Sequence, residues 1–211
     1  MGNSTQQRQF WDRIAARYAA RPLKNVAAYE AMLSDITGRL RPDDHVLELG
    51  CGTGGTAIRL APRVAHWTAC DFSSAMIGIA QAKPAGNNLR FVVADVGKAL
   101  ASSPCDLVCA INLLHLVDDL PATLAQIHAH LPPGGHLIIK IWCFADVTWR
   151  IRAIFSTLAV FRLFPAIRKL RHSDVLDALH HAGFEVVVEK VFGDYPQNPY
   201  FVLRKAATPA D

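Results

Sequence analysis

The chain has 211 residues, of which 51% are hydrophobic and 19% charged, and its formal net charge is +4. This length suits one domain of ordinary size, and the hydrophobic share excludes wholesale disorder. So small a charge excess gives no reason to expect nucleic acid or a membrane as the main partner.

The five cysteines form no C-x-x-C pair, and several lie in apolar runs. This pattern favours a reduced, cytoplasmic protein without a metal site. The polar N-terminus lacks the apolar core of a signal peptide. The longest uncharged apolar stretch, 153–161, is far shorter than the roughly 20 residues of a membrane span.

Helical periodicity dominates the first 40 residues. Phe10, Trp11, Ile14 and Tyr18 recur at spacings of three and four, which places them on one helix face. A second helix is expected over 26–40. We interpret residues 1–40 as helices that cap the main unit.

Strands and helices alternate after residue 41. Strands are expected over 45–49, 65–70, 89–94, 106–111 and 136–142, and helices over 56–60, 73–83 and 120–131. Strict alternation implies a parallel sheet that is covered on both faces. A ligand would then lie outside the carboxyl ends of the strands, where the strand order reverses.

The end of the chain breaks this alternation. A helix over 173–182 is followed by strands over 184–192 and 200–204, joined by a short turn-rich link. Strands linked so closely should pair antiparallel. The predicted fold is therefore α/β, with a Rossmann-like, doubly wound, seven-stranded mixed sheet and a C-terminal antiparallel hairpin.

The most informative stretch is the glycine-rich turn after the first strand. It reads Glu48-Leu49-Gly50-Cys51-Gly52-Thr53-Gly54-Gly55. Glycines allow a sharp turn and the close approach of a ligand, and the following helix presents unpaired N–H groups. The same turn also fits the G-x-G-x-x-G dinucleotide pattern, with Asp71 about twenty residues further on, so by itself it leaves a nicotinamide enzyme open.

Two more acids end strands. Asp71 ends the second strand and is followed by Phe72-Ser73-Ser74-Ala75-Met76, and Asp95, followed by Val96, ends the third. A carboxylate at a strand end can accept hydrogen bonds from both hydroxyls of a ribose. Taken singly, Asp71 could be a helix cap and Asp95 a solvated loop acid, but their joint occurrence with Glu48 makes independent structural roles a poor explanation.

With these residues the chain resembles the class I, Rossmann-like S-adenosylmethionine-dependent methyltransferases of the small-molecule type, over roughly 44–140. The resemblance implies that the glycine turn cradles the methionine part of the cofactor and that Glu48 orients its amino end. It implies Asp71 for the ribose and Asp95 for the adenine amino group. The cofactor-binding residues that it implies are Glu48, Gly50, Cys51, Gly52, Gly54, Asp71, Phe72, Met76, Asp95, Val96, Ile111 and Tyr18.

The acceptor side has three candidate catalytic residues. His115 and Asn112 lie in a stretch that resembles the family's fourth-strand region, and Tyr18 lies on an N-terminal helix whose aromatics fold over the cofactor in many members. His115 would serve as a base, or it is a helix-start residue tied to backbone. Tyr18 would cover the cofactor, or it packs on the core.

Residues 144–172 are expected to form a substrate lid. Apolar residues mixed with arginine over 148–171 suit a small hydrophobic acceptor, and a membrane surface is a second candidate partner. The alternative is an ordinary lid helix with a solvated basic face.

We therefore expect a single methyltransferase domain over 1–211, with cap helices in 1–40, the cofactor core in 41–143, the lid in 144–172, and the last helix and hairpin in 173–211. An NAD(P)-dependent oxidoreductase and a non-catalytic S-adenosylmethionine-binding protein stay open as alternatives. A nucleic-acid substrate is disfavoured, because Asn112-Leu113-Leu114-His115 stands where base-amino methylating enzymes carry Asn/Asp-Pro-Pro-Tyr. Oligomeric state is not predicted.

Overall fold

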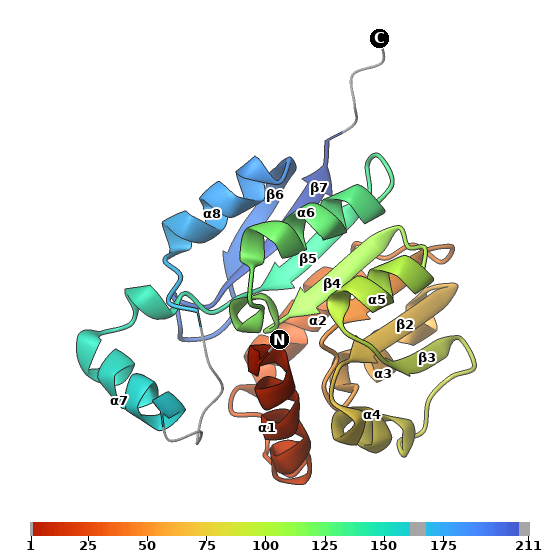
Figure 1. Ribbon diagram of the computed structural model, residues 1–211. Helices are drawn as coiled ribbons and strands as arrows, with labels where there is room; N and C mark the ends of the chain where they lie inside the picture. Colours follow the sequence, from red (N-terminus) through yellow and green to blue (C-terminus); the bar gives the residue numbers. More distant parts are fainter. Residues whose placement is uncertain (1, 161–167, 207–211) are drawn as a thin grey trace.

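A seven-stranded sheet forms the centre of the computed structural model, which describes residues 2–160 and 168–206 (Figure 1). The strand order is β3-β2-β1-β4-β5-β7-β6. The strands are β1 (His45–Leu49), β2 (His66–Asp71), β3 (Leu89–Val93), β4 (Leu107–Ile111), β5 (His136–Lys140), β6 (Phe184–Val191) and β7 (Pro199–Lys205). The first five are parallel, and β7 lies antiparallel between β5 and β6. The predicted mixed sheet with its C-terminal antiparallel pair is confirmed.

Helices cover both faces of the sheet (Figure 1). They are α1 (Gly2–Ala19), α2 (Val26–Thr37), α3 (Gly55–Leu60), α4 (Ser74–Gln81), α5 (Val96–Ser102), α6 (Leu120–His130), α7 (Trp149–Val160) and α8 (His172–His181), with short 3-10 turns η1 (Ala61–Arg63), η2 (Leu114–Leu116) and η3 (Phe144–Asp146). Side chains of α5, α6 and α8 pack with Leu47 and Leu49 of β1 on one face. Side chains of α2, α3 and α4 pack with Val46 on the other face. Successive side chains of β1 therefore point into two different hydrophobic clusters, one on each face of the sheet.

Helix α5 is the element that periodicity did not predict. It has only seven residues and carries Gly97 in its first turn, so it shows too little pattern to detect. Its start depends on Asp95, whose side chain accepts a hydrogen bond from the Lys98 N–H at 2.9 Å. An N-cap of this kind stabilises a short helix by satisfying an otherwise unpaired donor.

Helix α1 packs against α4, and Asp12 joins them. The Asp12 carboxylate accepts hydrogen bonds from the Ser73 hydroxyl at 2.6 Å and from the Ala75 N–H at 3.1 Å. Ser73 is the N-cap of α4, at the start of the helix expected over 73–83, and its hydroxyl oxygen accepts from the Met76 N–H at 3.1 Å. The N-terminal helix is thus anchored to the start of the helix that follows β2.

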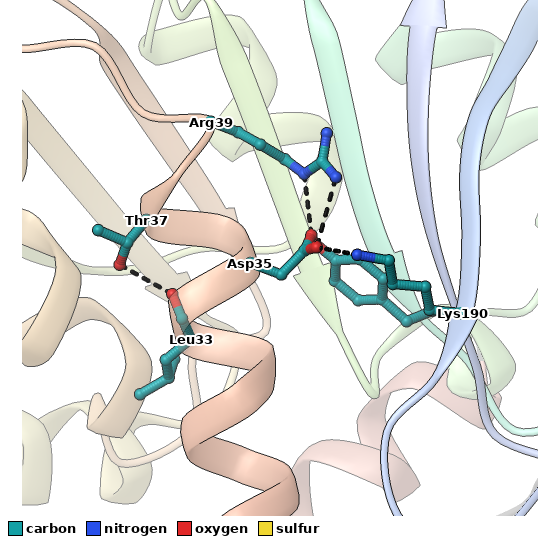
Figure 2. A network of polar contacts seen from close by, with 6 residues as sticks. Leu33, Asp35, Thr37, Arg39 and Lys190 are labelled. Atoms are coloured by element: carbon teal, nitrogen blue, oxygen red, sulfur yellow. Dashed lines mark hydrogen bonds and ion pairs between the residues drawn. The ribbon is translucent and has the colours of Figure 1, made fainter.

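Helix α2 is tied to the C-terminal strands by Asp35. Figure 2 shows this carboxylate between Arg39 and Lys190. It also accepts a hydrogen bond from the Tyr200 hydroxyl at 2.9 Å. Burial would raise the pKa of Asp35, but the hydrogen bonds from Arg39, Lys190 and Tyr200 outweigh it and lower the pKa to about 2.

The segment after β5 contains α7, which stands clear of the sheet (Figure 1). Trp149 and Ile154 of this helix are 68% and 60% exposed. Part of the expected 144–172 lid, residues 161–167, lies outside the described residues. Within the described ranges, no helix has the length and hydrophobicity to cross a membrane.

Candidate functional site

Two adjoining cavities lie at the carboxyl ends of the central strands. The larger has a volume of about 1080 Å³ and the smaller about 260 Å³, and both are lined by Gly50, Asp71 and Phe72. The strand order reverses between β1 and β4 at this edge, which is the usual ligand position in an open α/β sheet. The sequence-predicted residues on the larger cavity are Tyr18, Glu48, Gly50, Cys51, Gly52, Asp71, Phe72, Met76, Ile111 and Asn112. Asp95 and Val96 line the smaller one.

The glycine turn holds its shape through left-handed backbone. Gly52 has φ +54°, and a Cβ there would lie 4.0 Å from the Tyr18 ring, so the turn passes close beneath that aromatic side chain. Gly54, with φ +77°, lines neither cavity. A Cβ on Gly54 would lie 2.7 Å from the Phe91 ring, which gives this glycine a packing reason of its own. Its cofactor-binding role stays a prediction.

Asp71 links the glycine turn to the start of α4. One carboxylate oxygen accepts from the Gly52 N–H at 2.9 Å and the other from the Ser73 N–H at 2.9 Å. Burial raises the pKa of Asp71, against these hydrogen bonds. Each oxygen still has acceptor capacity for a ligand hydroxyl. The carboxylate therefore shapes the turn and also faces the cavity.

Glu48 lies beneath the same turn and is 3% exposed. Its Oε2 accepts a hydrogen bond from the Trp67 indole N–H at 3.1 Å. Burial raises the pKa of Glu48 to about 7, despite that hydrogen bond. A buried carboxylate poised at this pKa gains from a cationic ligand, because the added charge would favour its ionised form.

Asp95 and Val96 lie at the mouth of the smaller cavity, at the end of β3. Asp95 is the N-cap of α5 rather than a free loop acid, and its side chain is 49% exposed. Capping uses Oδ1, and Oδ2 lies 3.7 Å from the Lys98 ammonium. The cap orients the carboxylate at the rim where the resemblance expects adenine.

Of the three predicted catalytic residues, the structure brings Tyr18 and Asn112 to the cavity and leaves His115 out. Asn112 has φ +57°, an unusual backbone for a residue other than glycine, and its N–H donates to the Lys140 carbonyl at 2.7 Å. His115 lines neither cavity, is 5% exposed, and its burial lowers its pKa to about 3. Its main-chain carbonyl accepts from the Arg168 N–H at 3.0 Å, whereas its buried ring Nδ1 has no hydrogen-bond partner among the described residues. The alternative of a residue tied to backbone therefore applies to its main chain and not to its ring Nδ1. A catalytic role for His115 stays a prediction.

Sequence reasoning missed Lys140 and the residues of the β6–β7 connection. Lys140, Phe192 and Tyr195 all line the larger cavity. The available signal was a lysine that ends the otherwise apolar strand His136-Leu137-Ile138-Ile139-Lys140 at the carboxyl edge. The connection gave no signal, since only the fold brings it beside β5.

Cys51 also faces the larger cavity, and its chemistry there is limited. Burial raises the pKa of its thiol far above the ordinary value, with Glu48 and Asp71 adding to the shift. The thiol therefore stays protonated and provides a contact surface rather than a nucleophile. Among the described residues, no group of three or more His, Cys, Asp or Glu side chains could hold a metal ion.

Comparison with known proteins agrees with this geometry. The methyltransferase domain family matches residues 10–189. An iterative polyketide synthase of Emericella nidulans is 30% identical over 189 residues, covering 80% of this chain and 7% of the synthase. Trans-aconitate 2-methyltransferase of Deinococcus radiodurans is 37% identical over 103 residues, covering 48% of this chain and 39% of that enzyme. The matches thus span less than half of these relatives.

Structural similarity extends over nearly the whole chain. The solved complex of DhpI with SAH aligns with a TM-score of 0.76 at 19% identity, covering 97% of this chain and 98% of that one. At that identity the alignment establishes the fold alone. Because the family match spans most of the sequence and the fold agrees, the chain belongs to the class I S-adenosylmethionine-dependent methyltransferase family.

Proposed function

We propose that this protein binds S-adenosylmethionine across the two cavities and transfers its methyl group to a small, largely hydrophobic acceptor. The observation that carries the proposal is the convergence of Glu48, Asp71 and Asp95 from three neighbouring strands around the glycine turn. Their order along the sheet matches a ligand with a cationic amino end, a ribose and an adenine. Gly52 leaves the space that such a ligand needs above the turn.

When bound, the cofactor supplies a methyl group on a positively charged sulfur. An acceptor lone pair would form the new bond to the methyl carbon as the carbon–sulfur bond broke, and that electron pair would stay on sulfur. In-line attack needs donor and acceptor held in one orientation, which supplies much of the rate enhancement. We assign that positioning to Tyr18 from above and to Asn112 from the end of β4.

A dedicated base is needed only where the acceptor must lose a proton. His115 is placed poorly for that task, being buried and outside both cavities. The proposed mechanism therefore relies on holding the donor and the acceptor in one orientation.

The apolar character of the acceptor is part of the proposal. Trp11, Leu23, Leu116 and Phe192 line the larger cavity beyond the glycine turn. Burial of an apolar ligand against such side chains contributes about 25 cal/mol for each Å² removed from water. We also place the reaction in the cytoplasm, because all five cysteines are buried free thiols.

The test is calorimetric titration of the protein with S-adenosylhomocysteine, with NADH and NADPH as comparison ligands. We expect micromolar binding of the homocysteine compound alone. Asp71→Ala should weaken it by at least about tenfold, or 1.4 kcal/mol. Asp71→Asn is the matched control, since it keeps an acceptor for the Gly52 or Ser73 N–H and isolates the lost charge.

Two outcomes would contradict the proposal. Binding of a nicotinamide without binding of S-adenosylhomocysteine would favour an oxidoreductase. Binding of S-adenosylhomocysteine without turnover of any labelled acceptor would favour a non-catalytic binding protein.

A further inference from the structure

The sheet order separates the larger cavity into two sides. The glycine turn, Asp71 and Asp95 follow β1, β2 and β3, on one side of the switch point between β1 and β4. Lys140 ends β5, on the other side, where it pairs with Ile111 of β4 and Tyr200 of β7. Lys140 thus lies across the switch point from the glycine turn, Asp71 and Asp95, and its nearest predicted cofactor residue is Ile111 on the neighbouring strand.

The ammonium of Lys140 has few partners. It donates one hydrogen bond, to the Phe192 carbonyl at 3.3 Å, and forms no ion pair with a carboxylate of the described residues. The side chain is half-buried, and burial lowers its pKa. An ammonium has three donors, and leaving donors of a partly buried cation without acceptors costs free energy.

The acids nearest to this side have other partners. Asp35 is held by Arg39, Lys190 and Tyr200, and it lies behind Tyr200 rather than in the cavity lining. Asp194 of the β6–β7 connection lines the same cavity as Lys140, and its carboxylate accepts a hydrogen bond from the Asn25 amide at 3.4 Å. Among the described residues no carboxylate forms an ion pair with Lys140, so a negative group of a ligand would be the direct ion-pair partner of this ammonium.

We propose that Lys140 binds an oxyanion, such as a carboxylate, on the acceptor. This inference rests on the proposed function and narrows it to one class of acceptor, amphipathic acids. Ile111 and Phe192 beside Lys140 provide apolar surface for the body of such an acid, and Asn112 and Tyr195 add polar contacts at the same end. A charge-assisted hydrogen bond in a partly desolvated cavity is stronger than a neutral one.

The test uses the protein saturated with S-adenosylhomocysteine and two amphipathic acids as probes, namely octanoate and 4-phenylbutyrate. Each acid is titrated beside its neutral amide. We expect at least one acid to bind with a Kd below about 1 mM and about tenfold more tightly than its amide. Lys140→Met should remove that preference, and Lys140→Arg should retain part of it.

The control is Lys24→Met, which removes the same charge from the rim of the same cavity. It should leave the preference for the acid within about twofold of the wild type. Binding of S-adenosylhomocysteine to Lys140→Met should also stay within about twofold, which shows that the variant is folded and that Lys140 is not a cofactor ligand.

Three results would overturn the inference. They are the absence of any acid preference in the wild type, its persistence in Lys140→Met, and a loss of S-adenosylhomocysteine affinity in that variant. The first two leave the proposed function standing if S-adenosylhomocysteine binds. Failure of the wild type to bind S-adenosylhomocysteine is instead a failure of the proposed function.

Discussion

The side of the cavity that we propose for the cofactor and the side that we propose for the acceptor are built by different means. On the cofactor side, short hydrogen bonds connect successive strand ends, as when the Cys51 N–H donates to the Cys70 carbonyl at 2.9 Å and Asp71 binds the Gly52 N–H. On the acceptor side, the walls come from the β6–β7 connection, where Tyr195 is 56% exposed. Helix α7 beyond it exposes Trp149.

This difference teaches which part of the site carries family chemistry and which part carries specificity. A cofactor shared by a whole family needs backbone donors at fixed positions, which tight turns on a rigid sheet supply. An acceptor that differs between family members is better bound by longer loops between strands, because loops tolerate sequence changes that leave the hydrophobic core intact. Single substitutions can disturb one side of the cavity at a time.

The largest effect is expected for Gly54→Ala on the cofactor side. The new Cβ would lie 2.7 Å from the Phe91 ring, and the alanine would have to adopt the left-handed backbone of Gly54, with φ +77°. Left-handed backbone and overpacking together should cost about 3 kcal/mol of unfolding free energy. Urea denaturation measures it. Gly134→Ala is the control, because it has the same φ and no atom within 4 Å, and should cost only about 1 kcal/mol. Equal losses in the two variants would contradict the packing argument.

Glu48→Gln should separate stability from binding. The raised pKa means that the folded state holds a proton that the unfolded state lacks between pH 4.5 and about 7. Wild-type stability therefore falls as pH rises through that window, by roughly 2 to 3 kcal/mol from this group. The variant should lack this loss and be the more stable protein at pH 8, yet bind S-adenosylhomocysteine more weakly. Thermal unfolding at pH 5 and pH 8 measures the stability, and calorimetry at the same pH values measures the S-adenosylhomocysteine affinity. A variant less stable than the wild type at pH 8 would contradict the raised pKa of Glu48.

Asp35→Asn should loosen the acceptor side alone. The pKa of Asp35 is depressed from 3.8 to about 2, so its ionised form stabilises the fold at neutral pH, and that stabilisation is lost as pH falls from about 4 to 2. The shift corresponds to about 2 kcal/mol. Urea unfolding should give that deficit at pH 7 and a smaller one near pH 3. S-adenosylhomocysteine affinity should be unchanged, and a marked loss of affinity would show that the two sides are coupled.

The smallest effect is expected for Asp12→Ala, which releases α1 from the start of α4. Loss of two hydrogen bonds at a helix start should cost about 1 kcal/mol of stability. S-adenosylhomocysteine affinity should fall a few-fold, because Trp11 and Tyr18 lie over the cavity on the same helix. Arg17→Ala, at an exposed position of α1, is the control and should change neither quantity. If Asp12→Ala left the S-adenosylhomocysteine affinity unchanged, the position of α1 would not contribute to cofactor binding.

The sequence by itself determined the sheet, the glycine turn and the acids that line the cavities around it. Alternation of apolar runs along the chain reports burial directly, and Gly50, Gly52 and Asp71 act within a few residues of a strand end. Local patterns of this kind are legible because the backbone imposes their spacing. Helix α5 escaped detection because seven residues with a glycine carry too little periodicity.

Only the tertiary structure decided what faces the cavity. It placed His115 in the core, turned Gly54 toward Phe91, and set Lys140 beside a connection more than fifty residues further along the chain. The position of Lys140 depends on how β7 inserts between β5 and β6, which spacing in the sequence does not encode. The positions of His115 and Gly54 depend on packing after β4 and against β3. Tyr18 and Asn112 were predicted for the acceptor side and do line the cavity. Lys140 and the β6–β7 connection were not predicted, because long-range packing brings them there.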